Sequence, residues 1–299
     1  MKTEIVRLCR NAMFKAVFSN NKYMLSRLVQ AILDYLQFDI NVMDKELVIN
    51  NNELSLNNVH NRQLVCDYFI KVNDTMELNI EVNRSYYPGV EERNMGYCFK
   101  IYGVHFRSGD KYEKFKKYFL VQVNFNNYSN YDDETIKEFY LLDIKNPKNY
   151  LTKNVCFINI DIAQCFKLVY NEDKFKEMST LERFGAIFFT NILEDISYIL
   201  GSDMINMKEK NKFLEELKEK STDKEVLASL KFEDSIDYRF NLVEEDALER
   251  GSRQGFERGV EQNTIDMIQQ MLKNNIDLEK ISKISNKTIE EIKKIADLK

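Results

Sequence analysis

The sequence contains few residues that break secondary structure and few that hold metal ions through sulfur or imidazole. Only two prolines and nine glycines occur in 299 residues, so long helices meet few breakers. The two histidines, His60 and His105, stand apart, and the five cysteines form no C-x-x-C pair, which argues against a clustered zinc site. Because free thiols in a chain of this size suit a reducing compartment, we expect a cytoplasmic protein.

Long hydrophobic runs and an excess of positive charge are also missing. No segment approaches the roughly 20 consecutive apolar residues of a membrane span, and the first fifteen residues lack the apolar core of a signal peptide. We therefore expect no membrane partner. The formal net charge is −5, so any contact with nucleic acid must use a local patch. With 44% hydrophobic residues, the chain can fill the core of one large or two ordinary domains.

The most informative stretch runs from Val65 to Tyr87 and has the pattern of a β-hairpin. An apolar run that contains Asp67 is followed by a polar turn at residues 73–75 and by a return strand over residues 76–82. Every second residue of the return strand is apolar, which predicts one buried face. The opposite face then carries four polar residues, Glu77, Asn79, Glu81 and Asn83.

Asp67 and Glu81 can meet at one end of the predicted sheet if the hairpin register allows it. Two carboxylates held close together suit Mg²⁺, which keeps several waters and takes one or two protein carboxylates. Asn83 falls on the same side of the strand as Glu81, where it can hydrogen-bond a water but cannot neutralise an oxyanion. The alternative interpretation is that both acids are solvated side chains on the outer face of the hairpin.

Several segments resemble the PD-(D/E)XK nuclease-family transposases, also called recombination-promoting nucleases. The segment AMFKAVF at residues 12–18 is similar to the opening FKxxF helix of that family. Asp67 and the segment IEVN at residues 80–83 are similar to its acidic core, a D followed by E-x-Q or E-x-K. Arg93 and Tyr97 are similar to an RxxxY helix. The segment GDKY at residues 109–112, which leads into a strand, and the tail from Glu249 to Gly259 complete the resemblance.

The resemblance implies an α/β fold with a restriction-endonuclease-like core, a central mixed sheet flanked by helices, and a C-terminal all-α extension. It implies a metal-dependent DNA endonuclease that hydrolyses phosphodiester bonds and is linked to recombination or mobile-element biology. Asp67 and Glu81 are then the expected ligands of Mg²⁺, with Mn²⁺ as the alternative ion, and Asn83 joins them as a catalytic residue. The expected DNA-binding residues are Arg62, Arg93 and Tyr97.

Two residues depart from the family pattern. Asn83 stands where the family has Gln or Lys, and Asn11 stands where many members of the wider nuclease superfamily carry a further acid. Loss of a charge-stabilising group at the phosphate can cost on the order of 10²–10³ in rate. The alternative hypothesis is therefore a catalytically weak or inactive nuclease-fold protein that binds DNA or acts as an oligomeric interaction protein.

The rest of the chain predicts a mixture of helices and strands. Apolar spacings of three and four residues predict helix over residues 11–37, interrupted near Asn20, and an apolar helix over residues 181–200. The strands predicted after the hairpin cover residues 118–126, 138–145 and 155–162. Residues 91–118 interleave basic and aromatic side chains, which suits a polyanion, although a solvated helix with an aromatic core face gives the same pattern.

We expect three regions: a nuclease-like domain over residues 1–201, a charged helical linker over residues 202–260 and a small helical unit over residues 261–299. In the last region Asn286 is the expected N-cap of the final helix. Its cadence resembles a helix-turn-helix, but exposed isoleucine stripes also suit self-association or a scaffold role. The expected partners are DNA and further copies of this chain, with a dimer among the candidate oligomers.

Overall fold

The computed structural model describes residues 2–43, 45, 47–49, 53–54, 64–86, 89–104, 109, 111, 113, 117–127 and 134–296. The chain forms two compact units, Met1–Leu230 and Lys231–Lys299. The predicted domain boundary near Gly201 therefore falls inside the first unit.

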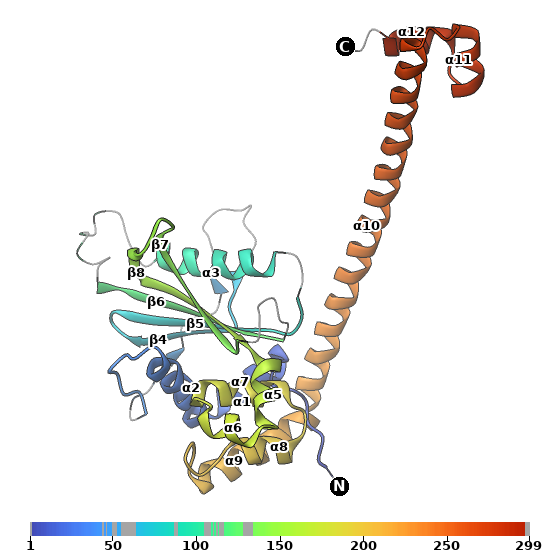
Figure 1. Cartoon of the computed structure of the whole chain (residues 1–299). Helices are drawn as coiled ribbons and strands as arrows, with labels where there is room; N and C mark the ends of the chain where they lie inside the picture. Colours follow the sequence, from blue (N-terminus) through green and yellow to red (C-terminus); the bar gives the residue numbers. More distant parts are fainter. Residues whose placement is uncertain are drawn as a thin grey trace. The chain divides into compact units, whose positions relative to one another are not determined.

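A six-stranded mixed sheet forms the centre of the first unit (Figure 1). Parallel pairing joins its three central strands, β5 (Met76–Asn83), β6 (Phe119–Asn126) and β8 (Asn146–Asp161). On one side, β4 (Tyr68–Asn73) pairs antiparallel with β5, and β1 (Val48–Ile49) pairs antiparallel with β4. On the other side, β7 (Ile136–Asp143) pairs antiparallel with β8. A separate two-stranded sheet consists of β2 (Glu53–Leu54) and β3 (Leu64–Val65).

The two-residue alternation of the central strands gives this sheet two different faces. The apolar residues of β5 are buried in the main core, as the hairpin pattern predicted: Met76, Leu78, Ile80 and Val82. The polar residues of β5 lie on the opposite face and are also buried. On that face α3 (Val90–Val104) packs through Tyr97, Cys98 and Ile101 against Leu120 and Val155, and Figure 1 shows it lying along the sheet.

Helices from both ends of the first unit cover the apolar face. The two predicted N-terminal helices are α1 (Asn11–Asn20) and α2 (Lys22–Tyr35), and Asn21 between them caps α2 by accepting from Met24 N at 3.0 Å. The other helices of this layer include α5 (Ile162–Val169), α6 (Glu172–Glu177) and α7 (Thr180–Phe189). Phe14 and Phe18 of α1 pack their rings against Phe188 of α7, so the two ends of the unit share one core.

The single helix predicted over residues 181–200 was wrong, because the chain forms two helices there. The first, α7, ends at Phe189, and the second, α8, covers Leu193–Ile199. Between them the chain is extended and pairs with the N-terminal segment, since Ile5 N donates to Asn191 O at 2.8 Å and Leu193 N donates to Thr3 O at 3.0 Å. This pairing with a distant segment interrupts an otherwise apolar helical sequence.

The Lys- and Glu-rich segment after Gly201 also differs from the charged helical linker that was predicted over residues 202–260. It forms α9 (Met207–Thr222), and two of its side chains, Phe213 and Leu217, are completely buried in the main core. A helix with few apolar residues thus still belongs to the first unit, because those residues lie on one face.

The second unit contains α10 (Lys224–Lys273) from Lys231 onward and two short helices, α11 (Leu278–Ser285) and α12 (Ile289–Ala296). Four isoleucines form its core: Ile268, Ile281, Ile292 and Ile295. Asn286 was predicted to be the N-cap of the last helix, and this prediction was wrong. Asn286 instead ends α11 with a left-handed backbone, φ 56°. Thr288 instead precedes α12, and its hydroxyl accepts from Glu291 N at 3.2 Å while Glu291 Oε2 accepts from Thr288 N at 2.8 Å.

Among the described residues, no helix combines the length and the apolar character that a membrane crossing requires.

Candidate active site

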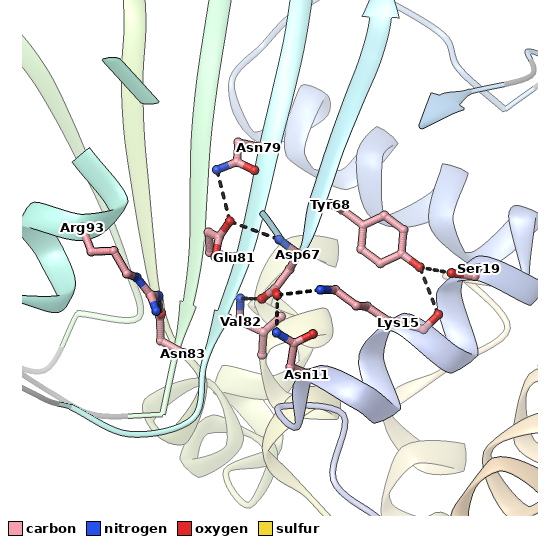
Figure 2. A network of polar contacts seen from close by, with 10 residues as sticks. All are labelled: Asn11, Lys15, Ser19, Asp67, Tyr68, Asn79, Glu81, Val82, Asn83 and Arg93. Atoms are coloured by element: carbon pink, nitrogen blue, oxygen red, sulfur yellow. Dashed lines mark hydrogen bonds and ion pairs between the residues drawn. The ribbon is translucent and has the colours of Figure 1, made fainter. Parts of the chain in front are cut away.

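The structure brings Asp67 and Glu81 together at the end of the β4–β5 hairpin. The backbone N–H of Asp67 donates to Glu81 Oε1 at 3.2 Å, and both acids are buried, with exposed fractions of 4% and 3%. The two acids therefore share one site, where the chain enters β4 beside Glu81 of β5 (Figure 2). The alternative of two solvated acids on an outer face does not describe them.

The hairpin register explains why the two acids meet. Tyr68, the first residue of β4, pairs with Ile80, so β5 continues past the start of β4 toward Asn83. Val82 N lies beyond the start of β4 and donates to Asp67 Oδ2 at 2.9 Å. The Asp67 side chain thus extends the ladder past the last paired residue, which fixes one of its two oxygens beside β5.

Two side chains of α1 hold the other oxygen of Asp67. The amide of Asn11 donates to Oδ1, and the Lys15 ammonium lies 3.4 Å from the same atom. Lys15 is placed in turn by Tyr68, whose hydroxyl donates to Lys15 O at 3.0 Å and shares a hydrogen bond with Ser19 Oγ at 2.6 Å (Figure 2). Sequence reasoning assigned Lys15 to a helix motif and missed its charge beside Asp67. The only available signal was the FK pair itself.

The environment of Glu81 favours its protonated form. Burial raises the pKa of this carboxyl well above its usual value of 4.5, and the neighbouring negative charge of Asp67 adds to the rise. The positive charge of Arg93 and hydrogen bonds from Asp67 N and Asn79 act in the opposite direction. A cation placed beside both acids would stabilise the ionised form of Glu81.

Arg93 provides a positive charge beside Asn83. Its Nη2 donates to Asn83 Oδ1 at 2.7 Å and to Asn94 Oδ1 at 3.0 Å. The amide nitrogen of Asn83 donates to Asn126 Oδ1 at 2.8 Å, so both ends of the Asn83 amide are engaged. The Arg93 guanidinium also lies 5.5 Å from the ring centroid of Tyr97, which is 7% exposed. This burial favours a supporting role for Tyr97, and its DNA contact stays a prediction.

A row of buried amides runs from Glu81 across the polar face. Asn79 Nδ2 lies within hydrogen-bonding distance of Glu81 Oε1, at 3.3 Å, and of Gln122 Oε1, at 2.8 Å. Gln122 donates to Asn124 Oδ1 at 2.8 Å, and Asn124 donates to Asn159 Oδ1 at 2.7 Å. Gln122 and Asn124 are two residues apart on β6 and so share one face of the sheet. Their connection to Glu81 depends on the order of the strands in the sheet.

Residues 11–226 match the model of a protein family described as PD-(D/E)XK nuclease family transposase. The chain belongs to this family. The match covers Asn11, the acidic pair and both flanking cations, and the mixed sheet flanked by helices confirms the predicted fold class. The comparisons with curated proteins and with solved structures gave no match. Membership of this family supports a function related to nucleases or transposases.

The oxygen donors of this transposase-family site suit a divalent metal ion. Within the described residues, no group of three or more His, Cys, Asp or Glu side chains could hold an ion, so the candidate ligands are the two carboxylates. Two carboxylates fit Mg²⁺, which completes its shell with water and phosphate oxygens. Asn11 and Lys15 already contact Asp67 Oδ1, so an ion at that oxygen would share it or replace them.

The third predicted DNA-binding residue, Arg62, lies outside the described residues.

Proposed function

We propose that the protein is a metal-dependent DNA endonuclease that hydrolyses phosphodiester bonds, in a process related to recombination or mobile elements. The observation that carries this proposal is the buried pair of Asp67 and Glu81 with one cation from α1 and another from α3 beside it. Family membership supplies the DNA substrate, since the matched family is one of nucleases and transposases.

Asp67 and Glu81 would hold Mg²⁺, or Mn²⁺ in its place. When bound, the ion supplies Lewis-acid stabilisation of the phosphate and a lower pKa for a coordinated water. Glu81 must lose its proton to act as a ligand, and Arg93 assists because its charge lowers the pKa of Glu81. Burial of both carboxylates lowers the local dielectric constant, which strengthens their interaction with a cation.

Asn83 carries no charge, so it cannot stabilise the negative charge on the phosphate. Lys15 and Arg93 would supply the positive charge for this role. Lys15 of α1 contacts Asp67, and Arg93 of α3 bonds to Asn83, two residues after Glu81. Positive charge therefore lies near the acidic pair although β5 carries none after Glu81. In this proposal Asn83 positions Arg93, because its amide oxygen accepts from the guanidinium and its nitrogen is held by Asn126. Arg93 then contacts a phosphate of the substrate strand.

The test is nicking of supercoiled plasmid DNA in the presence of Mg²⁺ or Mn²⁺. We expect the isosteric variants Asp67→Asn and Glu81→Gln to lose activity by about 10²-fold or more, because each removes a charge that holds the ion. Asp173→Asn, on the exposed α6, serves as the matched control and should cut like the wild type. Equal cutting by Glu81→Gln and wild type would overturn the assignment.

A second candidate is a catalytically weak nuclease-fold protein that retains DNA binding. It is favoured by the contacts of Asp67, whose two oxygens are already engaged by Val82 N, Asn11 and Lys15. DNA retention in a mobility-shift assay without nicking under any divalent ion would favour this function over the endonuclease.

A further inference from the structure

A cavity of about 280 Å³ lies between α3 and the polar face of the sheet, next to the candidate active site. Two of the residues that line it, Asn124 and Asn126, are the β6 register partners of Glu81 and Asn83. A third, Asn94, follows Arg93 on α3 and accepts its hydrogen bond. A group bound in this cavity would therefore lie beside the metal ion and the phosphate that Asp67, Glu81 and Arg93 are proposed to bind.

Aromatic and apolar side chains form one wall of the cavity. Phe99 and Met95 of α3 are 45% and 42% exposed, although both are large apolar residues. The ring of Phe99 lies 6.3 Å from that of Phe157 on β8 in an edge arrangement. An apolar wall that stays accessible inside a cavity offers a flat ligand a surface on which to stack.

Arg93 fixes which atom of each neighbouring amide is the oxygen and which is the nitrogen, for Asn83, Asn94 and Asn126. A guanidinium can only donate, so the groups of Asn83 and Asn94 that contact Arg93 must be their oxygens. Asn83 therefore donates its NH₂ group to Asn126 Oδ1. As a result, Asn94 and Asn126 each have their oxygen engaged, and their NH₂ groups have no acceptor among the described residues.

Glu81 orients a second set of amides. Its Oε1 accepts from Asp67 N, so the part of Asn79 that faces this oxygen is its NH₂ group. The same NH₂ group donates to Gln122, which in turn donates through Asn124 to Asn159 Oδ1. The Asn159 NH₂ group is thus left as a donor at the cavity, like those of Asn94 and Asn126.

The charge of the lining argues against a phosphate in this cavity. Among the described residues that line it, none is Lys or Arg, and Glu91 is the single charged residue. The described lining therefore offers a phosphate one carboxylate and no Lys or Arg side chain. A neutral aromatic ring with acceptor atoms at its edge fits the stacking wall and the three donors better.

We propose that this cavity binds an unpaired thymine of the DNA strand that the active site holds. Thymine presents two keto oxygens, O2 and O4, and a single N3–H donor, whereas adenine, cytosine and guanine each carry an amino group that would meet the donors of Asn94, Asn126 and Asn159. The base leaves its stack and lies against Phe99. This inference rests on the proposed function, because it takes DNA as the substrate.

The experiment measures binding of the full chain to fluorescent oligothymidylate, oligodeoxycytidylate, oligodeoxyadenylate and an abasic oligomer of equal length, in EDTA. We expect oligothymidylate to bind most tightly. Phe99→Ala should weaken that binding by about 5- to 150-fold through lost stacking. Asn159→Asp replaces a donor with an acceptor of the same shape, so it should move the preference toward oligodeoxycytidylate or oligodeoxyadenylate.

Tyr170→Ala is the matched control, because Tyr170 is an aromatic residue of the same unit that is 74% exposed away from this cavity. It should bind like the wild type. Equal binding of all four oligomers, unchanged binding by Phe99→Ala, or no binding at all would overturn the inference. Plasmid nicking separates the two proposals: nicking without base preference leaves the endonuclease and removes the base site, and base preference without nicking does the reverse.

Discussion

At the scale of single residues, the candidate site differs from its sequence motif in where its positive charge comes from. The segment Ile80–Asn83 ends in an amide, yet the acidic pair has the Lys15 ammonium at 3.4 Å and the Arg93 guanidinium beside Asn83. Both cations come from helices that pack on opposite faces of the sheet. The chemistry of the site therefore depends on side chains that the strand motif does not contain.

Lys15→Met tests whether this lysine contributes to cleavage. Because Lys15 contacts Asp67 and is the nearest described ammonium to it, we expect nicking to fall by about 10²-fold. The side chain of Lys15 is one-third exposed, so the melting temperature should change little. Lys176→Met, which removes an exposed lysine of α6, is the control. A variant that nicks at the wild-type rate would show that Lys15 only packs beside the acid.

The raised pKa of Glu81 predicts a pH dependence of stability. A group whose folded pKa lies above its usual 4.5 contributes stability that is fully present below that value and is lost as the pH rises through the folded pKa. Without metal, the melting temperature of the wild type should therefore fall as the pH rises from below 4.5 through the raised pKa of Glu81, by roughly 2–4 °C per kcal/mol of this contribution. Glu81→Gln should show a shallower fall.

The measurement is thermal unfolding in EDTA across that pH range. Glu172→Gln, an exposed acid of α6, should keep the slope of the wild type. Addition of Mg²⁺ should raise the melting temperature of the wild type at high pH and leave Glu81→Gln nearly unchanged, because only the wild type offers both carboxylates. Identical slopes for wild type and Glu81→Gln would contradict the buried environment of this acid.

At the scale of secondary-structure elements, α1 and the β4–β5 hairpin form the frame of the site. Tyr68 of β4 is buried, and its hydroxyl bonds to Lys15 O and Ser19 Oγ. Its ring also packs against Phe14 of α1 at a centroid distance of 5.1 Å. A strand residue thus fixes the position of the helix that delivers Asn11 and Lys15.

Tyr68→Phe keeps the ring and removes this hydrogen-bonded link. We expect a loss of about 1–3 kcal/mol in the free energy of unfolding, since the variant leaves buried partners without the hydroxyl. Nicking should also fall, because α1 is less firmly placed. Urea unfolding and plasmid nicking measure the two effects.

Tyr170→Phe, at the exposed end of α5, provides the comparison for Tyr68→Phe. Unchanged stability in both variants would show that the hydroxyl of Tyr68 does not tie α1 to the sheet.

At the scale of the whole molecule, the chain consists of two units with separate cores. The first holds the sheet and every described residue of the candidate site, and the family match ends at residue 226, close to its last residue, Leu230. The second has a small core of four isoleucines. The oligomer and the DNA-reading or docking role expected for the C-terminal helices stay predictions.

Ile281→Ala tests whether the second unit is stable independently of the first. Ile281 is completely buried on α11, so its truncation should cost about 2–5 kcal/mol within that unit. Amide hydrogen exchange should accelerate in α11 and α12 while plasmid nicking by the first unit is retained. Ile284→Ala, on the same helix but 57% exposed, should change exchange by much less. Faster exchange throughout the sheet would contradict two separate cores.

The sequence by itself determined the local pattern of the hairpin and the class of the fold. The alternation of Met76, Leu78, Ile80 and Val82 depends only on neighbouring residues, so both faces of β5 were predictable. The order of polar motifs was enough to indicate the family, and the matched model confirms it. The positions of α1, α2 and the central strands followed from the same periodicities.

Only the tertiary structure decided which distant residues surround the acidic pair. Lys15 meets Asp67 because Tyr68 fixes α1, and the amides of β6 and β8 reach Glu81 because parallel pairing places their strands beside β5. The break between α7 and α8 likewise depends on pairing with the N-terminal segment. These contacts join residues far apart along the chain, and local periodicity carries no information about them, because they form only when the core packs.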